Sequence, residues 1–217
     1  MLLVDSDWAQ PSLDIRVGQG GPAGERGDGR IDTILLRLPE LAQGREALDT
    51  WLGRDRDDLC LLLAPASRRS LDNIGDEHLD YLFGQLLAPA FDVVVVDLGS
   101  AAGLADRPQS WTTFWLARAD TVLVPLRDRP DHLRSATAAA HALSALGIGR
   151  MRLVLQAVQG QLAPADHGAA GLGGWVVHRV PWLQLGQPPE GRSLFDLSEP
   201  MADAIVALLP DLLAPRE

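Results

Sequence analysis

The chain has 217 residues, of which 47% are hydrophobic and 22% are charged, and its formal net charge is −10 at pH 7. This size and composition fit one globular α/β domain with a sizeable core. The negative charge argues against a general nucleic-acid-binding surface, which normally carries a basic stripe. All 19 basic residues are arginines, which excludes every mechanism that needs a lysine of this chain.

Short apolar segments alternate with helical patterns, which is typical of a parallel sheet with crossover helices. Four successive valines, Val93 to Val96, are apolar on both faces, which predicts an interior strand covered by helices on either side. We predict strands over residues 2–4, 59–63, 93–96, 121–124, 153–158 and 175–180. We see no internal repeat and no break that marks a second domain.

Helices are predicted between these strands, over residues 76–87, 107–116, 130–146 and 199–213. The third of them starts with a proline in its first turn and stops at Gly147, as helices commonly do. Trp111 and Trp115 lie four residues apart and are expected in the core or an interface. Cys60 stands alone in an apolar run and is expected to be buried and structural.

Two segments, 18–29 and 159–174, are rich in glycine and are expected to be the least ordered. The first matches the pattern G-x-G-x-x-A at Gly18 to Ala23, which in some proteins binds a dinucleotide. That fingerprint must follow a strand directly and open a helix, whereas here the nearest predicted strand ends more than ten residues earlier. Pro22 also removes a backbone donor. We therefore interpret this segment as a surface loop.

A hydrophobic strand that ends in an acidic residue and a glycine turn runs from Phe91 to Gly99. In P-loop NTPases the aspartate at this Walker B position, here Asp97, holds Mg²⁺. Many parallel strands end in aspartate simply to cap the following turn, so the pattern alone is weak. Other motifs along the chain strengthen the assignment of Asp97 to a Walker B position.

Four further segments resemble conserved motifs of one superfamily, in the same order and at comparable spacing. They correspond to its "LLVDxD…PSL", "ADxVLLV", "LVLNRV" and "IPxD…GxPL" motifs, and here they are residues 1–14, 119–125, 152–158 and 180–194. The chain resembles the MinD/ParA superfamily of deviant Walker A P-loop ATPases, and its long insert between Asp7 and Cys60 looks most like the CpaE/TadZ branch.

The resemblance implies a Rossmann-like, mostly parallel sheet flanked by helices, with ATP and Mg²⁺ as cofactors. Asp5 and Asp7 would match the switch aspartates that sense the γ-phosphate side and help to orient the attacking water. Asp97 would match the Mg²⁺-associated aspartate, and Gly99 follows it in the turn.

Two residues would border the adenine base. Gln156 stands where the family has an asparagine that contacts the base, and its extra methylene would misplace a bidentate contact. Pro181 falls in the segment beside the adenine. The family also implies protein partners or a homodimer, and a role in positioning the septum, a pilus or a secretion machine.

Family members begin with a strand and a KGGxGKT loop before the "LLVDxD" strand, whereas these 217 residues begin at the latter. We therefore expect a single, N-terminally incomplete domain over residues 1–217 that does not bind or hydrolyse ATP by itself. The P-loop strand of the family lies beside the Walker B strand. Without it, the strand over residues 93–96 would have an exposed edge that invites aggregation or pairing with a partner.

Three functions stay open. The first is a non-catalytic positioning protein of MinD/ParA/CpaE type. The second, which the loss of a central strand slightly favours, is a fragment of an active ATPase, and an in-frame KGGxGKT segment in the DNA upstream of Met1 would support it. The third is a Rossmann-like enzyme that uses a dinucleotide, which the misplaced glycine loop disfavours.

Other chemistry finds little support. The five histidines lack metal-ligand spacing, and no G-x-S-x-G elbow surrounds Ser100. Acidic flanks and Pro210 make the last predicted helix a core helix instead of a membrane anchor. The N-terminus lacks the features of a secretory signal, and no apolar run reaches the ~18 residues that span a bilayer. We therefore expect a cytoplasmic protein.

Overall fold

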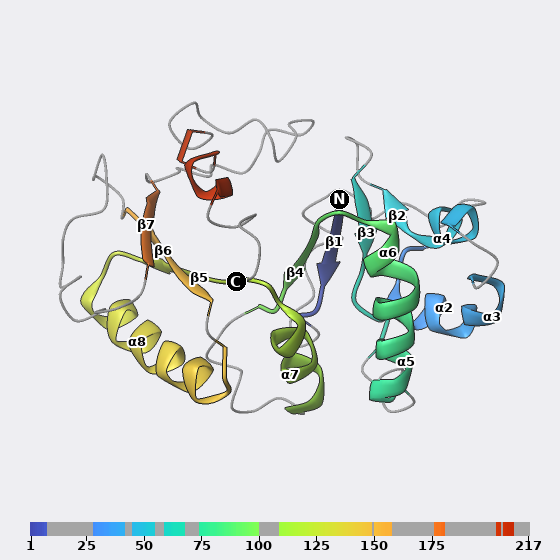
Figure 1. Ribbon diagram of the computed structural model, residues 1–217, viewed down its shortest axis with the longest axis horizontal. Helices are drawn as coiled ribbons and strands as arrows, with labels where there is room; N and C mark the ends of the chain where they lie inside the picture. The colour runs from blue at the N-terminus through green and yellow to red at the C-terminus, as the bar shows by residue number, and fades with distance from the viewer. Residues whose placement is uncertain are drawn as a thin grey trace. The chain divides into compact units, whose positions relative to one another are not determined.

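The computed structural model describes residues 1–7, 28–41, 45–54, 59–67, 74–99, 109–148, 150–157, 176–180, 203–204 and 206–210. These residues belong to two compact units, Met1–Trp115 and Leu116–Glu217 (Figure 1). Each unit contains its own β-sheet. No described helix is long and apolar enough to cross a membrane.

The first unit is built on a four-stranded sheet in the order β2-β3-β1-β4. The strand β1 pairs in parallel with both β3 and β4, whereas β2 pairs antiparallel with β3. The strands are β1 (Leu2–Asp5), β2 (Gly53–Arg54), β3 (Cys60–Leu62) and β4 (Val94–Asp97). Because β1, β3 and β4 run the same way, their carboxyl ends share one edge of the sheet.

Helices of the first unit lie before β2 and on either side of β4 in the chain. They are α2 (Ile31–Leu36), α3 (Leu38–Leu41), α4 (Arg45–Trp51), α5 (Asp76–Tyr81), the π-helix η2 (Leu82–Leu87), α6 (Ala88–Ala90) and α7 (Gln109–Arg118), whose last residues pass into the second unit. Asp76 and Glu77 lie in the first turn of α5, where their negative charges interact favourably with the positive end of the helix dipole. The π-helix continues α5 directly.

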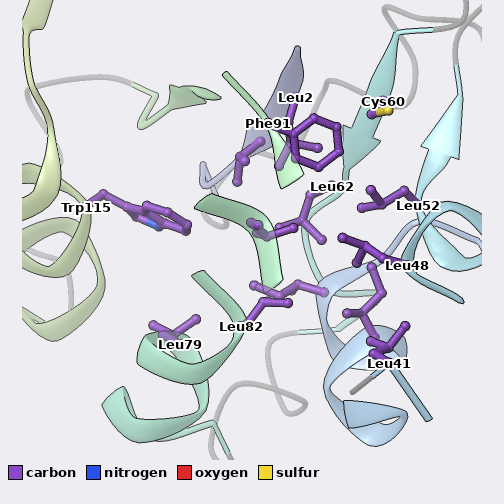
Figure 2. Packing of buried hydrophobic residues seen from close by; sticks show 14 of the residues in the cluster. Leu2, Leu41, Leu48, Leu52, Cys60, Leu62, Leu79, Leu82, Phe91 and Trp115 are labelled. Atoms are coloured by element: carbon purple, nitrogen blue, oxygen red, sulfur yellow. The ribbon is translucent and has the colours of Figure 1, made fainter. Parts of the chain in front are cut away.

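Alternate strand residues face the main core of this unit. Leu2 is aligned with Cys60 and Val94, and all three side chains belong to one hydrophobic cluster with Leu62 and Leu82. Figure 2 shows how leucines from the strands and helices meet there. Trp115 packs edge-on against Phe83 and Phe114, with ring centroids 5.4 and 5.1 Å away. The aromatic side chains thus join α7 to η2.

The other face of the sheet is covered unevenly. Leu61 of β3 is fully buried, and in register with it Leu3 of β1 is half-buried. The next residue in this row, Val95 of β4, is 46% exposed. The side chains on this face therefore become more exposed from β3 through β1 to β4.

The second unit contains three parallel strands in the order β5-β6-β7. They are β5 (Val122–Arg127), β6 (Met151–Gln156) and β7 (Val176–Val180), and α8 (Pro130–Ala145) connects the first two. The helix buries Leu133, Ala136, Ala140 and Leu143, which recur at the three- and four-residue spacing of one helix face. It ends before Gly147, whose φ of 82° suits a residue without a side chain.

Most sequence-based expectations for these elements are confirmed. The six predicted strands and the helices over 76–87, 107–116 and 130–146 are present within a few residues, and Cys60 and Trp115 are buried. Of the last predicted helix, the described residues 203–204 and 206–210 are helical, with Leu208 buried. The glycine-rich stretches 18–27 and 159–174 lie outside the described residues.

One expectation about β4 is wrong. The run of four valines predicted an interior strand, yet within the described part of the chain β4 ends the order of its sheet, and Val95 is 46% exposed. An apolar run on both faces indicates where burial is favourable, but it does not say whether a neighbouring strand is present.

Candidate functional site at the carboxyl edge of the first sheet

Two aspartates occupy equivalent places at the ends of neighbouring strands. Asp5 ends β1 and Asp97 ends β4, and the two residues are in register. Asp5 Oδ1 accepts a hydrogen bond from the backbone N–H of Asp7 (3.1 Å). Asp97 Oδ1 accepts one from the N–H of Gly99 (2.8 Å). Each aspartate therefore caps the turn that follows its own strand.

The two turns also touch each other. The backbone N–H of Ser6 donates to the carbonyl of Asp97 (2.8 Å), which extends the β1–β4 pairing by one residue. Gly99 adopts a φ of 69°, and a Cβ at this position would collide with the carboxylate of Asp7. Glycine is required here twice over, by the backbone conformation and by the close approach of Asp7.

Three carboxylates thus gather at one edge of the sheet. Asp5 is 4% exposed, Asp7 is half-buried and Asp97 is exposed. Like charges held on adjacent strand ends repel each other, most strongly where water is excluded. Among the described residues, the arrangement gathers negative charge at the ends of β1 and β4.

The described residues at this edge do not by themselves fit Mg²⁺-ATP. A triphosphate needs backbone amides or cationic side chains around it, and the chain has no lysine. Asp5, Asp7 and Asp97 all add negative charge. Within the described part of the chain, no group of three or more His, Cys, Asp or Glu residues is arranged to hold a metal ion. Asp97 instead uses one carboxylate oxygen to cap its turn.

The other predicted site residues fall elsewhere. The structure brings Asp5, Asp7, Asp97 and Gly99 together, whereas Gln156 ends β6 in the second unit. Pro181 and Ser100 lie outside the described residues. The proposed roles of these residues at a nucleotide stay predictions.

A second polar network at the carboxyl side of β3 was not anticipated. Asp28 lies just before α2 and accepts hydrogen bonds from the N–H of Arg30, the first residue flanking the helix (3.0 Å), and from Thr33 Oγ1 in its first turn (3.1 Å). The guanidinium of Arg30 donates to the carbonyl of Ala64 (3.0 Å). Asp28 falls in segment 18–29, which was predicted to be a surface loop, and no element was predicted for Arg30 or Thr33. The pattern of Asp28, Arg30 and Thr33 around the start of a helix was the available signal.

The carboxyl edge of the second sheet carries a buried acid that sequence reasoning also missed. Asp128 follows β5, is 2% exposed, and its backbone N–H donates to the carbonyl of Gln156 (2.9 Å). An acidic residue between a strand and the proline that begins a helix was the only signal in the sequence.

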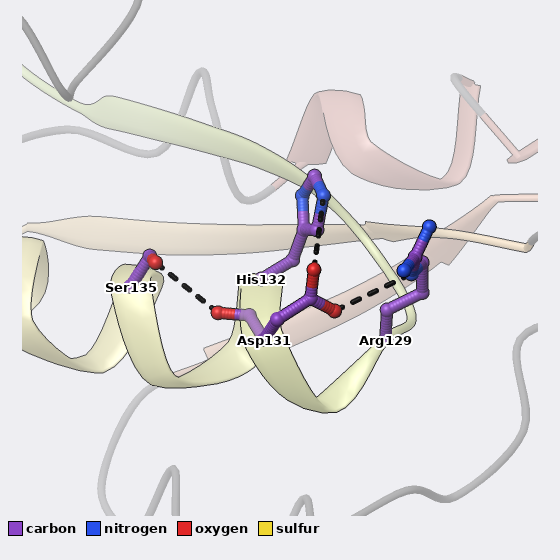
Figure 3. A network of polar contacts seen from close by, with 4 residues as sticks. All are labelled: Arg129, Asp131, His132 and Ser135. Carbon is purple, nitrogen blue, oxygen red and sulfur yellow. Dashed lines mark hydrogen bonds and ion pairs between the residues drawn. The ribbon is translucent and has the colours of Figure 1, made fainter.

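At the start of α8, exposed polar side chains form the network in Figure 3. Asp131 contacts Arg129 (3.3 Å) and His132 (4.0 Å), and the backbone carbonyl of Asp131 accepts a hydrogen bond from Ser135 Oγ (3.1 Å). Partial loss of hydration raises the pKa of Asp131. Hydrogen bonds from backbone N–H groups and the charges of Arg129 and His132 outweigh this effect. The pKa of Asp131 therefore lies below its ordinary value.

No protein-family model and no curated protein matches the chain. Among solved structures, a ParA family ATPase from Chlorobium tepidum TLS is similar over 84% of this chain and 70% of its own, with 19% identity and a TM-score of 0.60. The MinD cell division protein of Aquifex aeolicus is similar over 73% of this chain and 56% of its own (17% identity, TM-score 0.48).

A plasmid partition protein from Borrelia burgdorferi is similar over 71% of this chain and 64% of its own, with 16% identity and a TM-score of 0.43. The chain therefore spans less than two thirds of the MinD and partition proteins. The similarity to the ParA family ATPase shows the fold: this chain has the α/β architecture of that protein, with parallel sheets flanked by helices.

Proposed function

We propose that the chain is a cytoplasmic positioning protein of MinD/ParA type, close to the CpaE branch, that works through protein partners or a homodimer. It would help to place the septum, a pilus or a secretion machine. The 217 residues do this without binding or hydrolysing ATP by themselves. The fold shared with a ParA family ATPase and the motifs that resemble those of the superfamily support the proposal.

The observation that carries the nucleotide-free part is the chemistry of the carboxyl edge of β1 and β4. The superfamily combines such aspartates with the amides and the lysine of a phosphate loop, whereas the 217 residues contain Asp5, Asp7 and Asp97 but no lysine. Two of these carboxylates cap turns of the chain itself. Asp5 and Asp97 therefore act in this chain as structural caps.

The proposal is tested with a fluorescent fusion expressed in the bacterium that encodes the chain. We expect foci at a fixed cell site, and we expect the same foci from Asp97→Asn, because an asparagine Oδ1 can still cap Gly99. Asp92→Asn, a surface change at the other end of β4, is the matched control. Diffuse fluorescence of the parent would refute positioning. Foci lost only in the stably folded Asp97→Asn would indicate a cation at Asp97 and refute the nucleotide-free role.

A further inference from the structure

The segment 28–33 lies along the carboxyl end of β3, beyond the residues of β3 that pair with β2. Arg30 forms a parallel bridge to Leu63, the residue that follows β3. The N–H of Leu63 donates to the carbonyl of Gly29 (2.7 Å), and the N–H of Ile31 donates to the carbonyl of Leu63 (3.0 Å). The segment therefore continues the backbone hydrogen bonding of β3 past the end of the strand.

A pair of glycines lets this segment lie close to β2. Gly29 has a φ of 70°, and a Cβ at this position would lie 2.5 Å from the backbone nitrogen of Gly53 and 2.8 Å from its Cα. A side chain at position 29 would thus meet both an unfavourable backbone conformation and the backbone of β2. The close approach of the two glycines places segment 28–33 directly beside β2.

Two charged side chains of the segment bind the residues that follow β3, the β3 exit segment (residues 63–66). The guanidinium of Arg30 donates to the carbonyl of Ala64 (3.0 Å), a residue that is 1% exposed. A carboxylate oxygen of Asp32 accepts a hydrogen bond from the N–H of Ala66 (3.3 Å). Buried backbone groups need such partners, because an unsatisfied carbonyl away from water is costly.

The start of a helix does not by itself explain these contacts. Arg30 is the N-cap residue of α2, yet its side chain makes no cap hydrogen bond, and it binds Ala64 instead. Asp32 in the first turn favours the helix dipole, but this role does not require its bond to Ala66. Both side chains connect α2 to residues more than thirty positions away in the chain.

Asp28 orders the segment before it binds the β3 exit segment. Its carboxylate accepts hydrogen bonds from the N–H of Arg30 and from Thr33 Oγ1. The backbone of Arg30 is therefore held on one side by Asp28 and on the other by the bridge to Leu63. A guanidinium that starts from a fixed backbone loses less conformational freedom when it binds a carbonyl.

The β3 exit segment lies next to the candidate site. Val4 of β1 is aligned with Leu62 of β3, and the two strands run in parallel. The following residues, Asp5 and Leu63, therefore leave the sheet at the same edge and at the same level. Contacts that hold the β3 exit segment thus act on the immediate neighbour of the turn after β1.

We propose that residues 28–33 are a strap that holds the β3 exit segment at the carboxyl edge of the sheet, with Arg30 and Asp32 as positioning residues. The strap and the β3 exit segment open together as one local unit, while β1, β3 and β4 stay paired. This device goes beyond the proposed function. It stands or falls separately from that function, because it concerns contacts within the first unit that involve neither nucleotide nor partner.

Native-state hydrogen exchange of the full chain, read at single residues by NMR, tests the strap. Arg30→Met keeps an unbranched side chain but removes the donor, and it should speed exchange of the N–H groups of Leu63 and Ile31 roughly tenfold. The N–H of Ser6, which donates to the carbonyl of Asp97, should exchange as in the parent. Arg37→Ala is the control for charge, because it removes an exposed arginine at the end of α2.

Rescue separates a positioning role from a general loss of stability. Arg30→Lys restores a cationic donor, and it should return the exchange of Leu63 and Ile31 to within about threefold of the parent. Equal exchange in Arg30→Met and Arg30→Lys would overturn the role of Arg30. Faster exchange at Ser6 to the same degree as at Leu63 would show that the whole sheet opens, and this result would overturn the local unit.

Asp32 gives a second test at the other end of the β3 exit segment. Asp32→Ala removes the acceptor for Ala66 and should speed exchange of Ala66, Leu63 and Ile31 together, whereas Asp32→Asn keeps an oxygen and should change it less. If Arg30→Met fails to fold, this pair of variants decides the question. Parent-like exchange of all three N–H groups in Asp32→Ala would overturn the strap.

Discussion

Asp7 and Gly99 lie against each other across the ends of two parallel strands, so closely that any side chain at position 99 would collide with the Asp7 carboxylate. The contact joins the turn after β1 to the turn after β4. Each turn is in addition capped by an aspartate of its own strand, Asp5 or Asp97. At this acidic edge, which Asp5, Asp7 and Asp97 form, the position of each turn therefore depends on the position of the other.

Gly99→Ala should destabilise the chain by more than the cost of its backbone conformation. An alanine forced to positive φ costs about 1–2 kcal/mol, and the collision with Asp7 adds about 1–3 kcal/mol of overpacking. Gly147→Ala is the control, because Gly147 has a φ of 82° and nothing within 4 Å of the added Cβ. Urea denaturation of both variants measures the difference. Equal loss of stability would mean that Asp7 does not constrain position 99.

Asp97→Asn should reduce the sensitivity of stability to salt. The asparagine keeps an oxygen for the N–H of Gly99 but removes one of three neighbouring negative charges. Raising the salt concentration from about 0.02 M to about 0.5 M should stabilise the parent more than the variant, by roughly 0.5 kcal/mol. Asp92→Asn makes the same change in net charge away from the acidic edge. If both variants respond to salt alike, charge repulsion at this edge is negligible.

Leu62→Ala should cost about 2–5 kcal/mol of unfolding free energy. Leu62 is fully buried in the core drawn in Figure 2, and truncation there removes buried surface and leaves a cavity. Leu36→Ala, at a leucine that is 83% exposed, should change stability by less than about 0.5 kcal/mol. Similar losses from both changes would contradict this description of the core.

The Asp131 network predicts a defined pH dependence. The pKa of Asp131 is lowered in the folded chain from an ordinary value of 3.8. Its contribution to stability is therefore fully present above about pH 5 and is lost as the pH falls through the folded-state pKa. Thermal melting should show Asp131→Asn less stable than the parent near neutral pH and equally stable at low pH.

Arg129→Gln provides the control for that experiment. Because the charge of Arg129 is one cause of the lowered pKa, Asp131→Asn should have a smaller effect in the Arg129→Gln background. A difference between Asp131→Asn and the parent that stays constant from neutral to low pH would show that ionisation of Asp131 contributes nothing.

The sequence was most informative where apolar periodicity and turn residues agree. Four valines followed by aspartate and glycine located β4 and its turn, and the helix between Pro130 and Gly147 was bounded by residues whose backbone preferences stop a helix on either side. The parallel pairing of β1 with β4 places Asp5 and Asp97 side by side, as expected for residues at the ends of adjacent parallel strands. The site residues themselves came from the resemblance to the MinD/ParA superfamily, which named Asp5, Asp7 and Asp97.

Other features depend on tertiary contacts that no local pattern reveals. The helices α2 to α4 are short and lie in a segment without clear periodicity. The strand β2 has only two residues and exists through its pairing with β3. The edge position of β4 depends on which neighbours are present, and the collision between Asp7 and position 99 depends on two turns meeting in space.

The nucleotide-free account is tested most directly by calorimetric titration of the purified 217-residue chain with ATP in the presence of Mg²⁺. We predict no stoichiometric binding heat, because the residues described at the acidic edge are carboxylates and the chain contains no lysine. Omission of Mg²⁺ gives the baseline. A stoichiometric, Mg²⁺-dependent ATP signal that disappears in Asp97→Asn would contradict the account.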